Sequence, residues 1–227
     1  LENTVQERLL IITGSIDASP ADGEVFTGSK ASCDIHHLPH EILDPHELSV
    51  RFPGYRLPKG IMALYQPDGG FLLSERCIVA HVMAAQELGA EGHGRECVLG
   101  WEAKGQGVEV RTDRGRYSAA KLVVCAGAWG AKLVPELATL TVPERQVLGW
   151  FQPKRPALFR VPAFPVFNMA VEEGRYYGFP IYGIPGFKVG RYHHLEQRVD
   201  PDQMDRQAHR EDEDVLRRFT ARYFPDA

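Results

Sequence analysis

The clearest chemical signal in the sequence is an apolar strand followed by a glycine turn and a helix. Lys121–Cys125 reads KLVVC, a continuous apolar run typical of a strand buried on both faces of a parallel sheet. The chain then continues through Ala126–Gly130 (AGAWG) into a helical stretch that starts at Ala131. A glycine turn in this place lets the backbone approach a nucleotide, and the helix offers N–H groups to an anion. The same turn also serves sheet packing alone, so both interpretations stay open.

Histidines form a second group that could do chemistry. His36, His37 and His40 lie close together and His46 follows, which supplies enough imidazoles for a zinc or copper site. The spacing argues against such a site, because Pro39 interrupts a helix and the sequence has no HExxH motif. We therefore predict no metal site, and a His-rich metal-binding domain is the less favoured alternative.

Cysteine spacing and charge exclude further classes of protein. Cys33, Cys77, Cys97 and Cys125 form no CxxC pair, which argues against a zinc knuckle or a redox dithiol and is typical of reduced thiols in a cytoplasmic protein. The 227 residues carry a net charge of −4 without a basic stripe, which argues against nucleic-acid binding. The apolar runs are shorter than the ~20 residues of a membrane helix, and the N-terminus lacks a signal pattern. We expect a soluble, cytoplasmic protein without a nucleic-acid or membrane partner.

The first third of the sequence predicts alternating strands and helices. One helix has a particularly clear start, because Asp44 can cap it, Pro45 suits its first position and Glu47 lies three residues after the cap. Pro53-Gly54 ends this helix by Phe52. The remaining patterns predict strands over Leu9–Ile16 and Glu41–Leu43 and a weaker helix over Glu24–Ile35.

The longest helical pattern begins with Ser74 as its cap and ends at Gly89. Its apolar face contains His81, for which a place in the core is favoured over catalysis. Gly105-x-Gly107 predicts a hairpin turn rather than a phosphate loop, because no helix follows it. This turn separates the first two strands of a predicted three-stranded meander over Val98–Ala103, Val108–Thr112 and Arg116–Ser118.

The second half of the sequence predicts a sheet of short strands rich in aromatic residues, with one face open to a ligand. These strands are expected over Gln146–Gln152, Val166–Val171, Tyr176–Pro180 and Phe187–Tyr192, and an amphipathic helix over Asp212–Tyr223. The patterns together predict an α+β (mixed α/β) fold. It combines a layer with a crossover helix and a β-meander with an antiparallel sheet that has helices on one face.

Six blocks of sequence, taken in order, carry a resemblance to a known family. They are Pro67–Ser74 (PDGGFLLS), Gly89–Glu91 (GAE), Ala120–Trp129 (AKLVVCAGAW), Arg145–Gly149 (RQVLG), Tyr176–Pro180 (YYGFP) and Phe187–Gly190 (FKVG). With these blocks the chain resembles the FAD-dependent amine oxidases of the monomeric sarcosine oxidase and N-methyltryptophan oxidase type, within the D-amino-acid-oxidase-like superfamily. The order and spacing of the blocks run through nearly the whole chain.

The resemblance implies a division into three segments. Residues 1–70 correspond to a strand and helices of the substrate domain, and residues 71–135 to part of the FAD-binding domain, namely a helix, a strand, the meander and the buried strand with the GAW turn. Residues 136–227 correspond to the antiparallel substrate-binding sheet and the terminal amphipathic helix. The family's N-terminal GxGxxG motif and its C-terminal segment with the flavin-linking cysteine have no counterpart in this sequence. We therefore expect the central, substrate-side portion of a longer oxidase, and we expect the 227-residue chain by itself to be colourless and inactive.

The resemblance also implies which residues contact the cofactor. Val98 matches the position whose backbone meets the adenine, and Gly127, Ala128 and Trp129 match the turn that passes near the nucleotide. Plain sheet packing is the alternative for all four. Cys125 lies in the strand before this turn and does not match the cysteine that links the flavin.

Three further residues match catalytic positions of the family. Tyr177 matches a tyrosine that lines the substrate cavity, with an aromatic cover of the core as its alternative role. Lys188 matches a lysine whose charge lies where oxygen gains an electron, with a solvated strand lysine as the alternative. His193 or His194 matches a family histidine, and one extra residue after Gly190 leaves the choice open, although we place His193 in the site.

The implied reaction is oxidation of a secondary amine or N-methyl amino acid by O2, through FAD, to an imine and peroxide. Sarcosine, an N-methylated aromatic amino acid, pipecolate and a glycated amino acid all remain open as substrates. The alternative is a non-catalytic, self-associating binding module, in which exposed apolar surface favours a homodimer.

Overall fold

The computed structural model describes residues 1–227, and the chain divides into two compact units that we describe separately. The first unit contains Leu1–Ile78, Gln146–Glu196 and Arg206–Ala227, and the second contains Val79–Arg145 and Gln197–Asp205. Both units mix helices with β-strands, and this confirms the predicted mixed α/β class.

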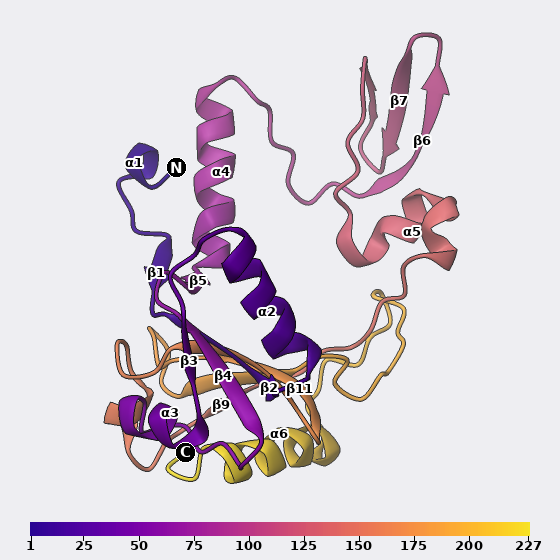
Figure 1. The fold of residues 1–227 in the computed structure, drawn as a ribbon. Helices are drawn as coiled ribbons and strands as arrows, with labels where there is room; N and C mark the ends of the chain where they lie inside the picture. The colour runs from indigo at the N-terminus through magenta and orange to yellow at the C-terminus, as the bar shows by residue number, and fades with distance from the viewer. The chain divides into compact units, whose positions relative to one another are not determined.

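A seven-stranded sheet is the framework of the first unit (Figure 1). It joins strands from both ends of the chain in the order β3-β4-β2-β10-β11-β12-β9. Its strands are β2 (Ser15–Pro20), β3 (Glu41–Leu43), β4 (Ile61–Gln66), β9 (Leu148–Phe151), β10 (Val166–Val171), β11 (Gly174–Phe179) and β12 (Phe187–Arg191). The four strands β9 to β12 pair antiparallel, as predicted, and β10 pairs with β2 in parallel.

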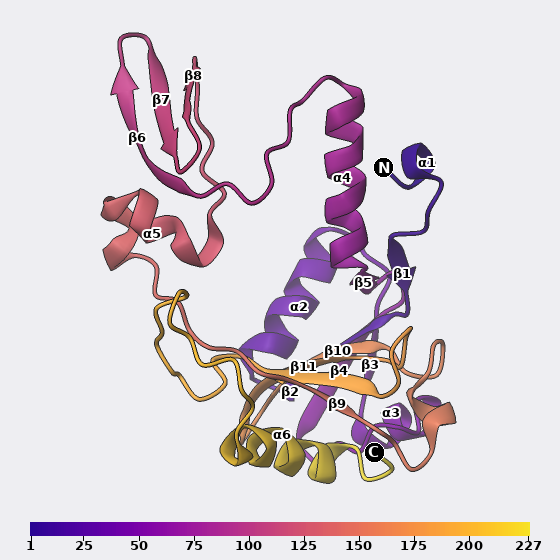
Figure 2. The same cartoon turned by 180° about the vertical axis from the view of Figure 1, so that it is seen from behind.

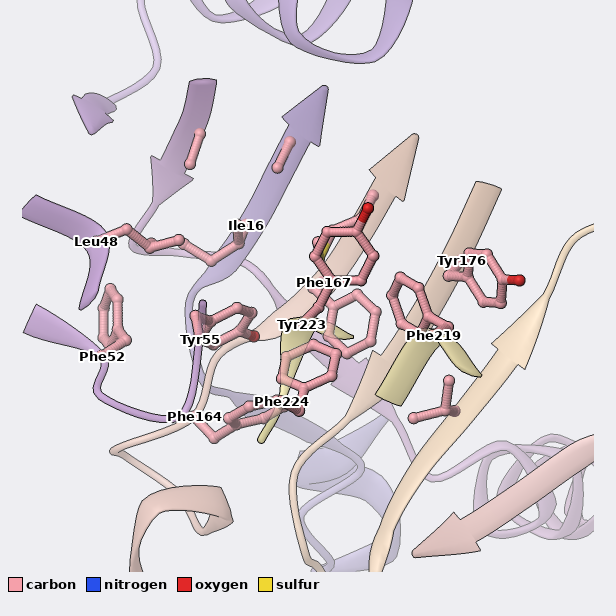
Figure 3. Packing of buried hydrophobic residues seen from close by; sticks show 14 of the residues in the cluster. Ile16, Leu48, Phe52, Tyr55, Phe164, Phe167, Tyr176, Phe219, Tyr223 and Phe224 are labelled. Carbon is pink, nitrogen blue, oxygen red and sulfur yellow. The ribbon is translucent and has the colours of Figure 1, made fainter. Parts of the chain in front are cut away.

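One face of this sheet packs against the hydrophobic core of the unit. Helix α6 (Arg210–Tyr223) lies along this face, and Figure 3 shows its Phe219 beside Tyr176 of β11. The two rings stack with centroids 3.8 Å apart and an interplanar angle of 4°. Phe167 of β10 and Phe224 at the end of α6 extend the cluster, with ring centroids 5.1 Å apart. Burial of these rings is the main stabilisation of the unit, because aromatic side chains remove the largest apolar areas from water.

Local chemistry explains where helix α3 of this unit begins, and packing on the sheet explains the place of helix α2. Helix α3 (Pro45–Arg51) starts with the predicted capping box, in which Asp44 accepts from the Glu47 backbone N–H and Glu47 accepts from that of Asp44. Helix α2 (Glu24–Ile35) covers the other face of the sheet from α6 at β2 and β4, as the two views agree (Figures 1 and 2). Its Phe26 and Cys33 pack on Leu64 of β4. Helix α2 also reaches β10, whereas β11, β12 and β9 have no helix of this unit over that second face.

Two predictions near the N-terminal end need correction. The run Leu9–Ile16 is not one strand but two, β1 (Leu10–Ile12) and β2, because Gly14 has a positive φ of 74° and turns the chain. Ser74 is the first residue of helix α4 (Ser74–Glu87) rather than its cap. Gly89 ends this helix with a φ of 91°, as expected. Strand β1 pairs with β5 (Gly70–Leu72), and helix α1 (Glu2–Val5) precedes it.

The second unit is built on the predicted meander. Its strands β6 (Val98–Lys104), β7 (Gly107–Thr112) and β8 (Arg116–Ala119) pair antiparallel, and Gly105 turns between the first two with a φ of 61°. The hairpin interpretation of Gly105-x-Gly107 is therefore confirmed. The rest of the unit is helical and short, with η1 (Gly127–Trp129), α5 (Gly130–Leu133) and η2 (Pro135–Thr139); η3 (Pro156–Phe159) belongs to the first unit.

The predicted buried strand over Lys121–Cys125 is wrong for this structure. These residues form no strand, and the Val123 side chain is 81% exposed. A parallel strand exists only by pairing with neighbours, and none of the three sheets of the chain contains these residues. An apolar run therefore signals a strand only where the chain supplies a partner for it.

No helix in the structure combines the length and the apolar character that crossing a membrane requires.

Candidate active site

Strand alternation gathers one set of side chains on the sheet face opposite α6. We call this set the open face: Trp150, Asn168, Arg175, Tyr177, Phe179 and Lys188. Lys188 of β12 is paired in register with Trp150 of β9 on one side and Phe179 of β11 on the other. The neighbours Phe187 and Val189 are fully buried on the core face. Period-two alternation thus directs Lys188 away from the core.

Lys188 lies between two aromatic rings of the open face. Its Nζ is 5.2 Å from the centroid of the Trp150 ring and 5.4 Å from that of Phe179. Both distances are within the range of a cation–π contact, which holds an ammonium without neutralising its charge. The lysine is half-buried and Trp150 is 46% exposed, so the charge faces a partly apolar surface. This placement can stabilise negative charge that forms above the sheet.

Tyr177 is the second predicted catalytic residue that reaches the open face. Its ring lies 4.9 Å from that of Tyr192 and 6.1 Å from that of Phe179. Gly190 lets the ring lie flat on β12, since a Cβ there would come within 2.6 Å of the Tyr177 Cζ. Burial, helped by the neighbouring Tyr192, raises the pKa of the Tyr177 phenol. The hydroxyl therefore stays protonated at neutral pH and can donate a hydrogen bond.

Two further rings extend the open face beyond Phe179. Phe71 of β5 lies 5.8 Å from Phe179 and 5.3 Å from Tyr182, both in T-shaped geometry. The rings stand edge to face, at interplanar angles of 77°, and form a partly exposed aromatic cluster with Lys188 beside Phe179. Such a cluster offers ring edges and faces to an aromatic ligand.

A polar network on the same face was missed by the sequence analysis. The Asn168 Nδ2 donates to Asp17 Oδ1 at 3.0 Å, and the Arg175 Nε donates to Asn168 Oδ1 at 2.9 Å. Ser29 of α2 is a further hydrogen-bond partner of Asp17. Burial raises the pKa of Asp17, against the effect of these hydrogen bonds. Part of the signal was present in the sequence, because Asn168 and Tyr177 occupy outward positions of two predicted strands and Arg175 directly precedes the second of them.

The two candidate histidines occupy different environments. His194 is fully buried and its Nε2 is 2.9 Å from Oδ1 of Asp212, which lies in α6. It therefore belongs to the core side of the sheet. His193 is exposed and has a positive φ of 53°. Its role in the site stays a prediction.

The four predicted cofactor contacts lie in the second unit. Val98 is the first residue of β6 and is 41% exposed, and Gly127 opens the short helix η1 with a φ of 50°. The Trp129 Nε1 donates to Asp202 Oδ1 at 2.7 Å, and Lys132 bridges Asp200 and Asp202. These contacts hold the Gly127–Trp129 turn against the segment around Asp202. Because Gly127 has no side chain, nothing on this residue itself covers its backbone.

No set of three or more His, Cys, Asp or Glu side chains in the structure could hold a metal ion. A cavity of about 810 Å³ runs along edge strand β9 and helix α6. It shares Trp150 with the open face but is lined by neither Lys188 nor Tyr177. We therefore place the candidate site on the open face, where charge, hydroxyl and aromatic surface meet.

Comparison with known proteins defines the class to which this chain belongs. The family described as "DAO: FAD dependent oxidoreductase" matches residues 12–227, so the chain belongs to the DAO family of FAD-dependent oxidoreductases. This confirms the resemblance derived from the six sequence blocks.

Individual relatives place the chain within the sarcosine oxidase and N-methyltryptophan oxidase type. Monomeric sarcosine oxidase of Bacillus sp. (strain NS-129) is 35% identical over 232 residues, which cover 100% of this chain and 60% of that protein. N-methyl-L-tryptophan oxidase of Escherichia coli (strain K12) is 30% identical over 201 residues, covering 86% of this chain and 53% of that enzyme. The chain thus spans about 60% of the length of the sarcosine oxidases that it matches.

Solved structures show the same fold. The open form of NikD, an amino acid oxidase essential for nikkomycin biosynthesis, superposes with a TM-score of 0.75 and 23% identity. The match covers 99% of this chain and 60% of NikD. L-proline dehydrogenase from P. horikoshii gives a TM-score of 0.71 at 17% identity, covering 95% of this chain and 57% of that one.

Proposed function

We propose that this chain is the substrate-side part of an oxidase that converts a secondary amine or N-methyl amino acid and O2 into an imine and hydrogen peroxide. The observation that carries this proposal is the placement of Lys188 on the open face, between Trp150 and Phe179 and beside Tyr177. Family membership supports FAD as the cofactor. Bound FAD would supply the hydride acceptor, and O2 would then take up the two electrons with two protons as peroxide.

The open face offers aromatic contacts and a positive charge to a flavin ring. Phe179, Phe71 and Tyr182 form an edge-to-face aromatic cluster, and Trp150 is exposed at the edge strand. Lys188 supplies one positive charge beside that cluster, where a ring that gains electrons becomes more negative. These residues would hold the isoalloxazine face. Val98 and Gly127–Trp129 stay predicted contacts of the nucleotide.

Lys188 acts in this proposal by electrostatics. Its ammonium is held between two rings and adds a fixed positive charge at a partly apolar surface, where charge interactions are stronger than in bulk water. The negative charge that develops on oxygen during reduction is then stabilised before solvent can rearrange. The lysine need not donate a proton for this effect.

Tyr177 acts on the amine side. Its protonated hydroxyl can donate to a substrate oxygen, and its ring limits water at the reacting carbon. His193 is exposed near the end of β12 and would contribute at the edge of the open face. Tyr177 therefore orients the substrate, while Lys188 serves the oxygen step.

The test separates the two half-reactions in the flavin-loaded protein. Lys188→Met is expected to slow reoxidation by O2 on the order of 10²–10³-fold, comparable with the loss of other preorganised electrostatic groups. Reduction by amine should change by less than about threefold. Lys154→Met is the control, because Lys154 is not part of the open face and its Nζ donates to the Pro225 carbonyl oxygen. Equal loss in both half-reactions would remove the proposed role of Lys188.

A second candidate function is a self-associating module. Exposed apolar side chains on α4 and directly after it favour this function, with Ile78 63% and Leu88 90% exposed. Sedimentation of the purified 227-residue chain tests the module, since a dimer supports it and a monomer rules it out. Visible absorption does not separate the two functions, because we expect the isolated chain to be colourless under both.

A further inference from the structure

We propose that Arg175 is a specificity residue that binds a second carboxylate, at the far end of an N-substituted amino acid substrate. The inference rests on the proposed function, because it places that substrate on the open face. It goes beyond that function by assigning the substrate to the acidic amino acids.

Arg175 is held in place by neutral groups. Its Nε donates to the Asn168 amide oxygen at 2.9 Å, and its guanidinium carbon lies 4.9 Å from the centroid of the Tyr192 ring. Asn168 is held in turn by Asp17 at 3.0 Å. The guanidinium therefore has a fixed plane, and both Nη groups are left to donate elsewhere. Two parallel N–H donors in one plane match the two oxygens of a carboxylate.

The charge of Arg175 is not used for a salt bridge within the fold. The two acidic residues that precede it in sequence, Glu172 and Glu173, pair instead with Arg222 of α6. Asp17 is close enough to interact electrostatically with Arg175, but it forms no salt bridge with the guanidinium, and the Asn168 amide links the two side chains. An exposed, oriented arginine without a salt-bridge partner is suited to bind an anion from outside the chain.

The position of Arg175 determines which carboxylate it can reach. Arg175, Tyr177 and Phe179 alternate along β11 on the open face, and Phe179 pairs with Lys188. Phe179 lies four positions after Arg175, which is roughly 13 Å along a strand. The α-carboxylate of an amino acid lies one bond from the α-carbon and stays near the reacting centre. A carboxylate at the end of the substrate side chain extends toward Arg175 instead.

The test compares two isosteric probes that differ by one charge, N-methyl-L-glutamate and N-methyl-L-glutamine. In the flavin-loaded protein, kcat/KM should favour the acid on the order of tenfold to a hundredfold, the range expected for a charge-assisted bidentate pair. In Arg175→Gln this preference should fall to about one, mainly through KM. Arg175→Lys should retain part of it. Arg210→Gln removes an exposed charge from α6 on the other side of the sheet and should match the parent protein.

Calorimetric titration of both probes under anaerobic conditions provides a readout independent of turnover. Binding of the acid but not the amide, lost in Arg175→Gln, supports the inference even if neither probe is oxidised. That outcome would count against the proposed oxidase and not against Arg175. Oxidation of simple N-methyl amines with equal affinity for acid and amide would overturn the inference while leaving the oxidase intact. An unchanged preference in Arg175→Gln would also overturn it.

Discussion

The two faces of the seven-stranded sheet use the same strands for opposite purposes. Tyr176 and Tyr177 are neighbours in β11, yet Tyr176 is 2% exposed under Phe219 and Tyr177 faces the candidate site. On the core face, aromatic rings pack on one another and bury their area. On the open face, the rings stay partly exposed and lie among Lys188, Asn168 and Arg175. Alternation along a strand thus lets one segment contribute stability on one side and chemistry on the other.

The adjacent tyrosines provide the strongest test of this difference. Tyr176→Ala is expected to lower the free energy of unfolding by about 3–5 kcal/mol, because it removes a stacked, buried ring. Tyr177→Ala should cost about 1–2 kcal/mol, since its ring is only half-buried. Urea unfolding followed by tryptophan fluorescence measures both values. Equal losses would show that the open face is part of the stabilising core.

Removing the hydroxyl of Tyr223 or of Tyr177 should give a smaller difference in the free energy of unfolding between the two faces, and the effect at Tyr223 should depend on pH. The Tyr223 hydroxyl donates to Glu173 Oε2 at 2.8 Å on the core side. Tyr223→Phe should cost about 1.5–3 kcal/mol at pH 7, the range for a hydrogen bond to a charged group. Tyr177→Phe, on the open face, should change the free energy of unfolding by less than about 0.5 kcal/mol.

The cost of Tyr223→Phe should depend on pH in a defined direction. Burial of Glu173 opposes its ionisation, but hydrogen bonds from Tyr223 and Arg222 outweigh that effect and hold the pKa of Glu173 below its ordinary value. The carboxylate therefore stabilises the fold fully above the unfolded value of about 4.3 and loses that contribution as the pH falls further. The deficit of the variant should shrink below about pH 4. A deficit that is constant from pH 7 to pH 3 would contradict this assignment.

Gly178 and Gly190 provide the comparison of the two faces with the smallest expected effects. A Cβ at Gly178, on the core face, would come within 2.6 Å of the Lys188 carbonyl oxygen and 2.4 Å of the Phe167 ring. Gly178→Ala should therefore cost about 1–3 kcal/mol, because backbone cannot move aside. At Gly190 the obstacles are the ends of the Tyr177 and Leu148 side chains. Gly190→Ala should cost less than about 1 kcal/mol and raise KM by displacing Tyr177, as thermal unfolding and steady-state kinetics would show.

Much of the fold follows from local patterns in the sequence. The capping box at Asp44, the hairpin at Gly105 and the end of α4 at Gly89 were predicted because each depends on a few adjacent residues. The strands β10 to β12 were also predicted, since alternation with aromatic and β-branched residues is a local signal. The six sequence blocks further identified the family, which comparison with known proteins confirmed.

Pairing between distant segments was beyond these patterns. The run Lys121–Cys125 has the composition of a buried strand, but no strand of this chain pairs with it. Conversely, Asp17 and Asn168 lie 151 residues apart in sequence and meet only because β2 and β10 are parallel neighbours. Neither outcome can be derived from composition, because both depend on which strand edges meet.

The sequence by itself determined the class of the protein, the alternation that directs Lys188 and Tyr177 to one face, and the local ends of its helices. These properties depend on residue type and on spacing of a few positions. Only the tertiary structure decided that His194 enters the core beside Asp212 and that Arg175 is oriented by Asn168 over Tyr192. The physical reason is that such contacts join residues from different elements, and their formation depends on the packing and register of the whole sheet.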